Sequence, residues 1–326
     1  MPPYLQNQEQ LPEGNHANED FVHQQWRTSE SDIYGSSDIS FVADPYPQSN
    51  TTSEKLDTVM RVLYGQGSYS PKGNTQDNVQ GGTVFFSRPF GNQSYAQAMV
   101  RYDMAVDPNF DWMLGGKWPG IYGGIPSRGC SGGHQANGDT CFSVRLMWRE
   151  NGLGEVYMYV PTSETLCKQT EEVICNKQYG ISVSRGRITY PRGKWTKFEI
   201  FTKVNDPPSE SNGVLQVWQD DQIVVELTNL RYRTNNAFAI SSLMFSTFFG
   251  GSSTQYATPH DTFAYFKNIQ FSVADPVQLS PSTSSMASPS LLDNLPIFSF
   301  FRFMFSSFHD MTILFWNKMY TSLIGQ

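Results

Sequence analysis

Residues 141–160, CFSVRLMWRENGLGEVYMYV, contain two runs of alternating side chains joined by a short polar segment. Such alternation is typical of β-strands, whose successive side chains point to opposite faces of a sheet. The segment 150–154, Glu-Asn-Gly-Leu-Gly, predicts a hairpin turn, so we expect the two strands to be antiparallel neighbours. The first strand then turns an apolar set toward the core, made of Phe142, Val144, Leu146 and Trp148.

The opposite face of this hairpin carries polar and aromatic side chains. Ser143 and Arg145 share it in the first strand, and Tyr157 and Tyr159 share one face of the second. We therefore expect Arg145 and the two tyrosines to lie on one surface. A plainer interpretation exists for each residue, since a Tyr-x-Tyr strand is more often a half-buried sheet face and a single arginine there is usually solvated.

The rest of the chain has the same character. Turn signals recur about every 8–15 residues, no 12-residue window shows convincing helical periodicity, and no repeat of fixed period is present. Residues 220–221, Asp-Asp, are a hairpin-turn candidate. We predict an all-β fold, a two-sheet antiparallel sandwich or jelly roll, with strands at 83–87, 96–106, 141–149, 154–160, 180–184, 195–203, 214–219, 222–227, 238–248 and 263–272.

Composition agrees with this class and excludes others. The chain has 326 residues, of which 16% are charged and 14% aromatic, with 26 Gly and 19 Pro. That composition argues against a helical bundle. The net charge of -7 argues against a generic nucleic-acid binder. The mean hydropathy of -0.42 excludes a polytopic membrane protein.

The chain divides into four parts by composition. Residues 1–54 are polar and are predicted to be mostly disordered. Residues 55–275 form the expected domain, and 276–292 read as a Ser/Pro-rich linker. Residues 293–326 are aromatic and apolar, but charged residues interrupt them too often for a transmembrane helix. An interfacial segment, a docking tail and a translated intron remain open for this tail.

The four cysteines lie close together, at Cys130, Cys141, Cys167 and Cys175. Pairing of nearest neighbours would close two short loops, and we favour it over a zinc site because neither spacing resembles a CxxC pair. We expect no metal and no cofactor. Disulfides imply an oxidising compartment.

The same cysteines and two glycosylation sequons, at Asn50 and Asn92, favour a secreted protein. The first twenty residues contain neither the basic nor the apolar region of a signal peptide. Either a first exon is missing from this sequence or the protein stays inside the cell. We favour the first, and expect an extracellular monomer with no membrane span and no nucleic-acid partner.

Several long motifs resemble the polysaccharide lyase family 14 pattern. They are GGKWPGIYGG at 115–124, CFSVRLMWR at 141–149, GEVYMYV at 154–160, YGISVSRGRITYPRGKWT at 179–196 and MFSTFFGGSSTQYATP at 244–259. The resemblance covers roughly residues 60–272. It implies a fungal-type lyase on a jelly-roll, concanavalin-like sandwich, acting on a uronate polymer of the alginate or glucuronan type.

The resemblance also implies site residues. Lys117 matches the motif lysine, Ser143 and Arg145 the S-x-R pair, and Tyr157 and Tyr159 the Y-x-Y pair. The chain departs from the pattern in its long loop 130–141 and in having a tryptophan after the lysine, and both differences bear on subsite shape. We expect substrate contacts from Trp118, Tyr122, His134 and Arg149.

These residue types suit β-elimination, in which a base removes the C5 proton of a uronate and O4 leaves. Arg145 can neutralise the carboxylate with its guanidinium fork, Lys117 can add a charge and Ser143 a hydrogen bond. A tyrosine, with Tyr159 marginally favoured, can serve as base and acid, and Lys117 is the alternative base. No metal is then required.

Other functions are weighed against this one. His134 or His260 could be a base brought in by folding, whereas His16, His23 and His309 lie in the tails. Glu150 and Glu155 could form a glycosidase-like pair, but two carboxylates would repel a uronate. A non-catalytic carbohydrate-binding module on the same fold is the main alternative, and an inactive gene product is the third.

Overall fold

A computed structural model describes residues 4–5, 15–28, 33–47, 57–69, 81–126 and 129–280, all within one compact unit. The predicted tail and most of the predicted linker lie outside these residues. The helices are α1 (Asn15–Trp26) and α2 (Glu164–Cys167). The strands are β1 (Tyr4–Leu5), β2 (Ile39–Ala43), β3 (Thr58–Tyr64), β4 (Thr83–Ser87), β5 (Ser94–Val106), β6 (Gly116–Gly124), β7 (Cys141–Trp148), β8 (Leu153–Tyr159), β9 (Val173–Ile174), β10 (Ile181–Thr189), β11 (Thr196–Lys203), β12 (Gly213–Gln219), β13 (Gln222–Leu230), β14 (Ile240–Phe249) and β15 (Thr262–Val277).

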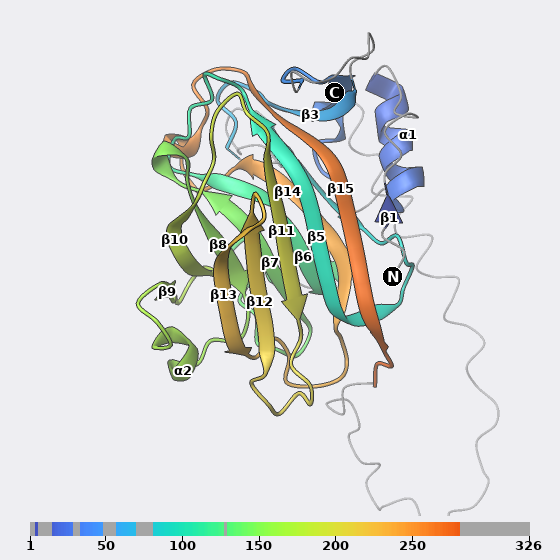
Figure 1. Ribbon diagram of the computed structural model, residues 1–326, viewed down its shortest axis with the longest axis vertical. Coiled ribbons are helices and arrows are strands. Elements are labelled where there is room, and N and C mark those ends of the chain that lie inside the picture. The colour runs from blue at the N-terminus through green and yellow to red at the C-terminus, as the bar shows by residue number, and fades with distance from the viewer. Residues whose placement is uncertain are drawn as a thin grey trace, which may run out of the picture. The chain divides into compact units, whose positions relative to one another are not determined.

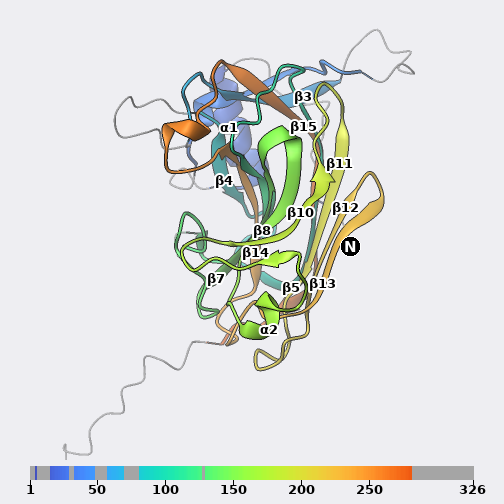
Figure 2. The same cartoon turned by 90° about the vertical axis from the view of Figure 1, so that its left-hand side faces the viewer.

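The strands form two antiparallel layers, which confirms the predicted sandwich (Figure 1). One layer has the order β2-β3-β15-β5-β11-β12-β13, and the second has the order β4-β14-β6-β7-β8-β10-β9. The layers join where Ile240 of β14 pairs with Tyr95 of β5. A view turned by 90° separates β8 and β10 from β11, β12 and β13 (Figure 2). The second layer carries the segments that the sequence singles out.

The hydrophobic core fills the space between the layers. The inward side chains of β7 and those of β5 belong to one buried cluster, as their alternation predicts. Tyr102 of β5 also donates a hydrogen bond across the core to the carbonyl of Pro119 in β6, at 3.2 Å. Full burial of one such large side chain contributes about 1.5–3 kcal/mol. The core therefore fixes which face of the second layer points outward.

The motif at 115–124 contains strand β6, which is missing from the strands predicted from the sequence. A side chain at Gly120 would meet the carbonyl oxygen of Val144 at 2.0 Å, so glycine lets the neighbouring strand β7 approach. A β-bulge lies between Lys117 and Gly120, where proline is tolerated because the ladder is already interrupted. The bulge places both residues on the outer face, although they are three positions apart.

Two hairpin turns have the predicted positions. Asp220 and Asp221 adopt positive φ values of 48° and 68°, as a two-residue turn between paired strands requires. Asn151 and Gly152 do the same between β7 and β8, at 61° and 72°. Arg145 therefore pairs with Tyr157, and Ser143 with Tyr159, as the alternating pattern predicted.

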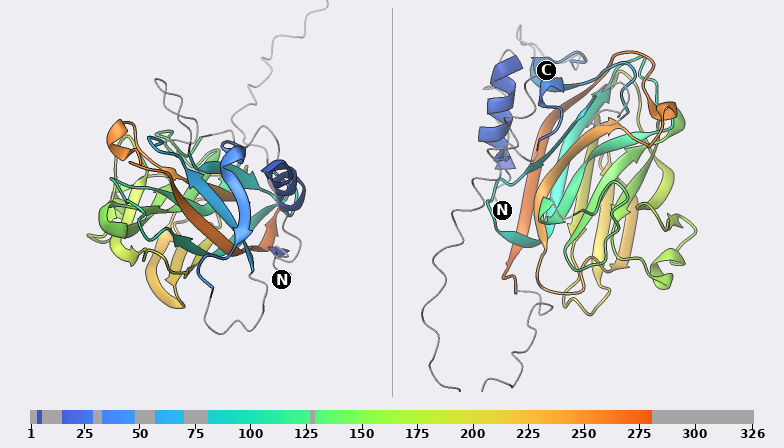
Figure 3. Two further views of the ribbon diagram at one scale, coloured as in Figure 1. Left: turned by 90° about the horizontal axis from the view of Figure 1, so that it is seen from above. Right: turned by 180° about the vertical axis from the view of Figure 1, so that it is seen from behind.

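Part of the segment 1–54, which is predicted to be mostly disordered, is ordered in the residues that the structure describes. Helix α1 and strand β2 lie there, and β2 pairs with β3, so the folded domain begins before residue 55 (Figure 3, dark and light blue). Val22 and Trp26 are buried, and Trp26 packs against Phe85 at a ring distance of 5.0 Å. A few apolar anchors hold an otherwise polar segment, which an average over composition cannot detect. Within the described residues, no helix is long and apolar enough to cross a membrane.

Candidate active site

The outer face of the second layer gathers four of the predicted residues from three adjacent strands. Lys117 comes from β6, Arg145 from β7, and Tyr157 and Tyr159 from β8. Neighbouring strands lie about 4.8 Å apart, so side chains from β6 and β8 can meet above β7. The pairing of Lys117 with Met147, and of Arg145 with Tyr157, brings the four side chains together.

The two phenols form a contacting pair. Their rings lie 5.6 Å apart at an angle of 83°, an edge-to-face arrangement. The Tyr157 hydroxyl oxygen accepts the backbone N–H of Gly180 at 2.9 Å, and that of Tyr159 accepts the N–H of Gly133 at 3.0 Å. The oxygen of each phenol is thus held in place by a backbone N–H donor.

Burial and the neighbouring Tyr159 raise the pKa of Tyr157 above its usual value, while the Gly180 N–H and the charge of Arg145 oppose that rise. Tyr157 therefore stays protonated at neutral pH. A protonated phenol can donate a proton to a leaving oxygen.

Arg145 is a buried cation, only 2% exposed. One Nη atom donates to the hydroxyl of Ser246 at 3.1 Å, and its buried Nε has no hydrogen-bond partner within the part of the chain that the structure describes. Among the described residues no carboxylate forms a salt bridge with it. Burial lowers its pKa from the usual arginine value, but a guanidinium remains charged at physiological pH. An uncompensated buried charge is costly, so this position calls for an anion.

Lys117 is half-buried, and its Nζ lies 3.1 Å from the sulfur of Met147 and 4.5 Å from the centroid of the Tyr157 ring. None of the described carboxylates forms a salt bridge with it. Burial, followed by the charges of Arg145 and Arg149, holds its pKa well below the usual lysine value, and the charge of Glu155 only partly opposes this. A lysine with a lowered pKa can accept a proton near neutral pH.

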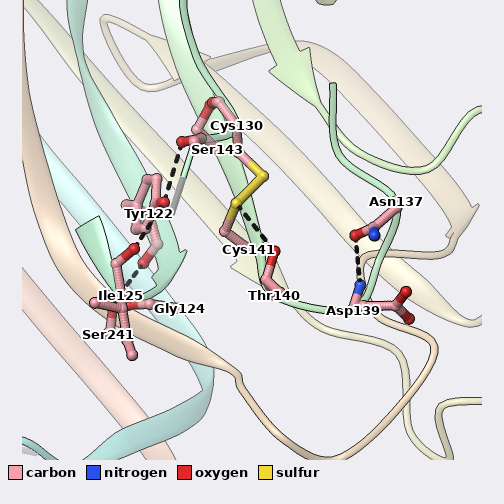
Figure 4. Close-up of a disulfide and its surroundings, with 11 residues drawn as sticks. Tyr122, Gly124, Ile125, Cys130, Asn137, Asp139, Thr140, Cys141, Ser143 and Ser241 are labelled. Atoms are coloured by element: carbon pink, nitrogen blue, oxygen red, sulfur yellow. Dashed lines mark hydrogen bonds between the residues drawn. A yellow bond between two sulfur atoms is a disulfide. The ribbon is translucent and has the colours of Figure 1, made fainter. Parts of the chain in front are cut away.

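The hydroxyl groups of Ser143 and Tyr122 form hydrogen bonds with the loop that follows β6. Ser143 Oγ donates to the carbonyl of Cys130 at 2.6 Å, and Tyr122 donates to the carbonyls of Ile125 and Gly129, each at 3.1 Å (Figure 4). Both side chains are fully buried. Their hydroxyl protons are committed to the protein, which differs from the predicted hydrogen bond between Ser143 and a sugar carboxylate.

The four cysteines pair as predicted, Cys130 with Cys141 and Cys167 with Cys175 (Figure 4 shows the first). Their pairing excludes the zinc alternative. The first disulfide closes the loop that contains Gly133, and so it lies in the same loop as a donor to Tyr159. The sequon residue Asn92 is exposed in the turn before β5, whereas Asn50 lies outside the described residues.

The other predicted contacts are dispersed. Trp118 is a correction, because it points inward, has no exposed surface and packs on Trp148 at a ring distance of 4.2 Å. The indole therefore has no surface left for a sugar. His134 is exposed in the loop before β7, and His260 lies just before β15, a strand of the other layer.

Arg149 and Glu155 form a salt bridge at 2.5 Å, a pairing that the sequence pattern does not predict. Glu155 also receives hydrogen bonds from Arg185 and Ser182, each at 2.6 Å. A carboxylate engaged in this way is not a free acid, and Glu150 is exposed at the hairpin turn, so the two do not resemble a glycosidase pair. Glu155 lies two positions before Tyr157 and four before Tyr159. The alternation of side chains along a strand could therefore have placed it on this face from the sequence.

The fold and the family match together define the class of this chain, a lyase that acts on an acidic polysaccharide. The family described as "Polysaccharide lyase 14" matches residues 52–269, and the chain belongs to this family. The chain is therefore an enzyme, and the alternative of a non-catalytic carbohydrate-binding module is not supported. A comparison with curated protein sequences gives no match.

Solved structures agree with this assignment. A marine PL-14 alginate lyase from Aplysia kurodai is 31% identical, with a TM-score of 0.65, and the match covers 81% of this chain and 97% of that one. Alginate lyase Aly36B is 19% identical, with a TM-score of 0.62, and 84% and 97% of the two chains are covered. Alginate lyase vAL-1 from Chlorella virus is 22% identical, with a TM-score of 0.53 and coverage of 74% and 95%. The last two show the fold alone.

Proposed function

We propose that this enzyme cleaves a uronate polymer of the alginate or glucuronan type by β-elimination. The observation that carries the proposal is the buried, carboxylate-free Arg145 beside Lys117 and two phenols on one face. The 31% identical structure described as an alginate lyase supports the choice of substrate class.

Arg145 neutralises the uronate carboxylate in this proposal. Its Nε is buried and has no hydrogen-bond partner among the described residues, so the proposal requires the uronate carboxylate to reach this atom, where the neighbouring Nη can complete a two-pronged contact. Withdrawing the carboxylate charge makes the C5 proton more acidic and stabilises the enolate-like intermediate that follows its removal. Because the guanidinium is already fixed by Ser246, little reorganisation is needed when charge develops.

Lys117 acts as the base that removes the C5 proton. The lowered pKa leaves more free amine at a given pH than an ordinary lysine has, and the ammonium formed by proton transfer then lies beside the developing negative charge. Tyr159 is the alternative base, supported by the Gly133 N–H, which would stabilise a phenolate oxygen.

A phenol of the Tyr157–Tyr159 pair supplies the proton to the leaving O4. The raised pKa of Tyr157 favours it as the acid, because it remains protonated while Lys117 is free. The C5–H bond breaks, a C4–C5 double bond forms and the C4–O4 bond breaks, so atoms and charge balance without a metal or an oxidant.

A product assay tests the proposal. Purified enzyme is incubated with polymannuronate, polyguluronate and glucuronan, and the ultraviolet absorbance of the new C=C bond is followed together with product mass. We expect unsaturated ends from at least one polymer. Products with saturated new non-reducing ends, which a hydrolase would produce, or no product from any uronan would contradict β-elimination.

We also propose that the enzyme is an extracellular monomer. The two disulfides and the exposed Asn92 sequon support an oxidising compartment. The protein is expressed in a secreting host, and its recovery from the medium in oxidised form tests the compartment. Light scattering of the purified protein tests whether it is a monomer. A reduced, intracellular protein or a stable dimer would contradict them.

A further inference from the structure

Glu155 holds two arginines on the same face as the candidate active site. Its side chain is fully buried, and one oxygen accepts Nε and Nη2 of Arg149 at 3.0 and 2.5 Å. The other oxygen accepts Nε of Arg185 and the hydroxyl of Ser182, each at 2.6 Å. All four interactions favour the carboxylate. Burial alone would raise the pKa of Glu155, but the hydrogen bonds and the charge of Arg149, with Ser182 and Arg185, outweigh it and lower the pKa.

The cluster has one more positive charge than it needs for its own pairing. A single carboxylate serves two guanidinium groups, and no other described carboxylate forms a salt bridge with either of them. Both arginine side chains reach solvent, Arg149 with 22% and Arg185 with 45% of the side chain exposed. The pair formed by Arg187 and Glu172, two positions along the same strand from Arg185, is balanced one to one. Excess positive charge that is oriented and accessible is suited to an anionic ligand.

The cluster lies next to the reacting groups. Glu155 is two residues before Tyr157 on the same face of β8, a separation of about 6.6 Å along a strand. It pairs across the sheet with Met147, whose sulfur contacts Lys117. Ser182 of β10, which Glu155 contacts, pairs with Tyr157. Arg149 and Arg185 are therefore adjacent to the side chains that would act on the cleaved uronate unit.

We propose that Arg149 and Arg185 form a second carboxylate-binding subsite, which binds the uronate unit adjacent to the one that is cleaved. This inference rests on the proposed function, since both subsites bind one polymer. Glu155 is a positioning residue, because it touches the two guanidinium groups and turns their remaining N–H donors outward. Two fixed cationic subsites require consecutive uronates, so the enzyme should discriminate against chains in which neighbouring carboxylates are neutralised.

The main test is Arg185→Gln, with Arg187→Gln as the matched control from the same strand. Steady-state kinetics are measured on a uronan that the wild type cleaves. Loss of one charged contact should raise KM about tenfold and leave kcat within about threefold. Arg187→Gln should change neither value, and Arg185→Lys should recover part of the lost affinity. An unchanged KM in Arg185→Gln would overturn the subsite.

A second measurement uses the substrate. The same uronan is partly methyl-esterified, so that many cleavable units lack a charged neighbour. The wild type should lose far more kcat/KM on this polymer than Arg185→Gln does, since the variant has already lost the contact. Equal losses in both enzymes would contradict the inference. A wild type without lyase activity on any uronan would instead overturn the proposed function, so the two failures are distinguishable.

Discussion

The Nζ atom of Lys117 lies 4.5 Å from the centroid of the Tyr157 ring, over a strand that separates their own strands. Met147 of that intervening strand is nearly buried and contacts the same Nζ at 3.1 Å. Burial and the charges of Arg145 and Arg149 disfavour the protonated form of this amine, and they outweigh the attraction between an ammonium and the face of the Tyr157 ring. This relationship underlies the first two predictions.

Replacing Lys117 with arginine keeps a cation but removes a group that can accept a proton near neutral pH. We expect kcat to fall by about 10²–10⁴-fold, the usual contribution of a general base, while KM changes little. Initial rates of unsaturated-product formation measure this. Lys177→Arg, at an exposed position, is the control and should behave as the wild type. Near-wild-type turnover in Lys117→Arg would assign the base to Tyr159 instead.

The pH profile should follow the lowered pKa of Lys117. As pH falls through that pKa the amine becomes protonated, so kcat/KM should decrease on the acid side. The acid Tyr157 loses its proton only above the usual tyrosine pKa, so activity should extend into the alkaline range. Initial rates are measured from mildly acidic to alkaline pH, with enzyme stability checked at each point. They define the acid and alkaline limbs of the kcat/KM profile. An acid limb near the ordinary lysine pKa would contradict this assignment.

Arg145→Met should separate stability from activity. Methionine removes a buried charge that has no carboxylate partner, so we expect folding stability to rise, by about 1–4 kcal/mol if the site repacks well. Activity should fall by at least about 10²-fold, because the carboxylate loses its guanidinium. Thermal unfolding and product formation are measured on the same preparation.

Arg233→Met is the control for that variant. Arg233 is equally buried, but it donates to the carbonyls of Asn205 and Phe238 and pairs with Asp206. Its loss should lower stability because these acceptors lose their partner. If Arg145→Met also proves destabilising, the guanidinium has a structural role that the hydrogen bonds do not reveal.

Removing the Cys130–Cys141 disulfide by a double serine variant should lower stability by about 2–4 kcal/mol. It should also lower kcat, because the loop it closes brings the Gly133 N–H to Tyr159. The matched variant lacks Cys167–Cys175, which closes a loop without a donor to either phenol, and it should lose stability but retain more activity. Equal kcat values in the two variants would argue against a positioning role for the first loop.

Much of the fold was predictable because alternation, turn residues and cysteine spacing are local signals. The hairpin of β7 and β8 and the Asp220–Asp221 turn follow from neighbouring residues alone. Strand β6 was missed because its glycines and proline are typical of turns, although here they allow close strand packing and a bulge. Helix α1 was missed because two buried anchors do not change the polar average of its segment.

The amino-acid sequence by itself determined an all-β sandwich, two disulfides and a set of cations and phenols that resembles one lyase family. Only the tertiary structure decided which of these residues meet. It turned Trp118 into the core, committed Ser143 to a loop carbonyl and joined Arg149 and Arg185 through Glu155. The physical reason is that alternation specifies a face only within a strand, whereas contacts between strands depend on register, bulges and the burial of charges contributed from distant positions.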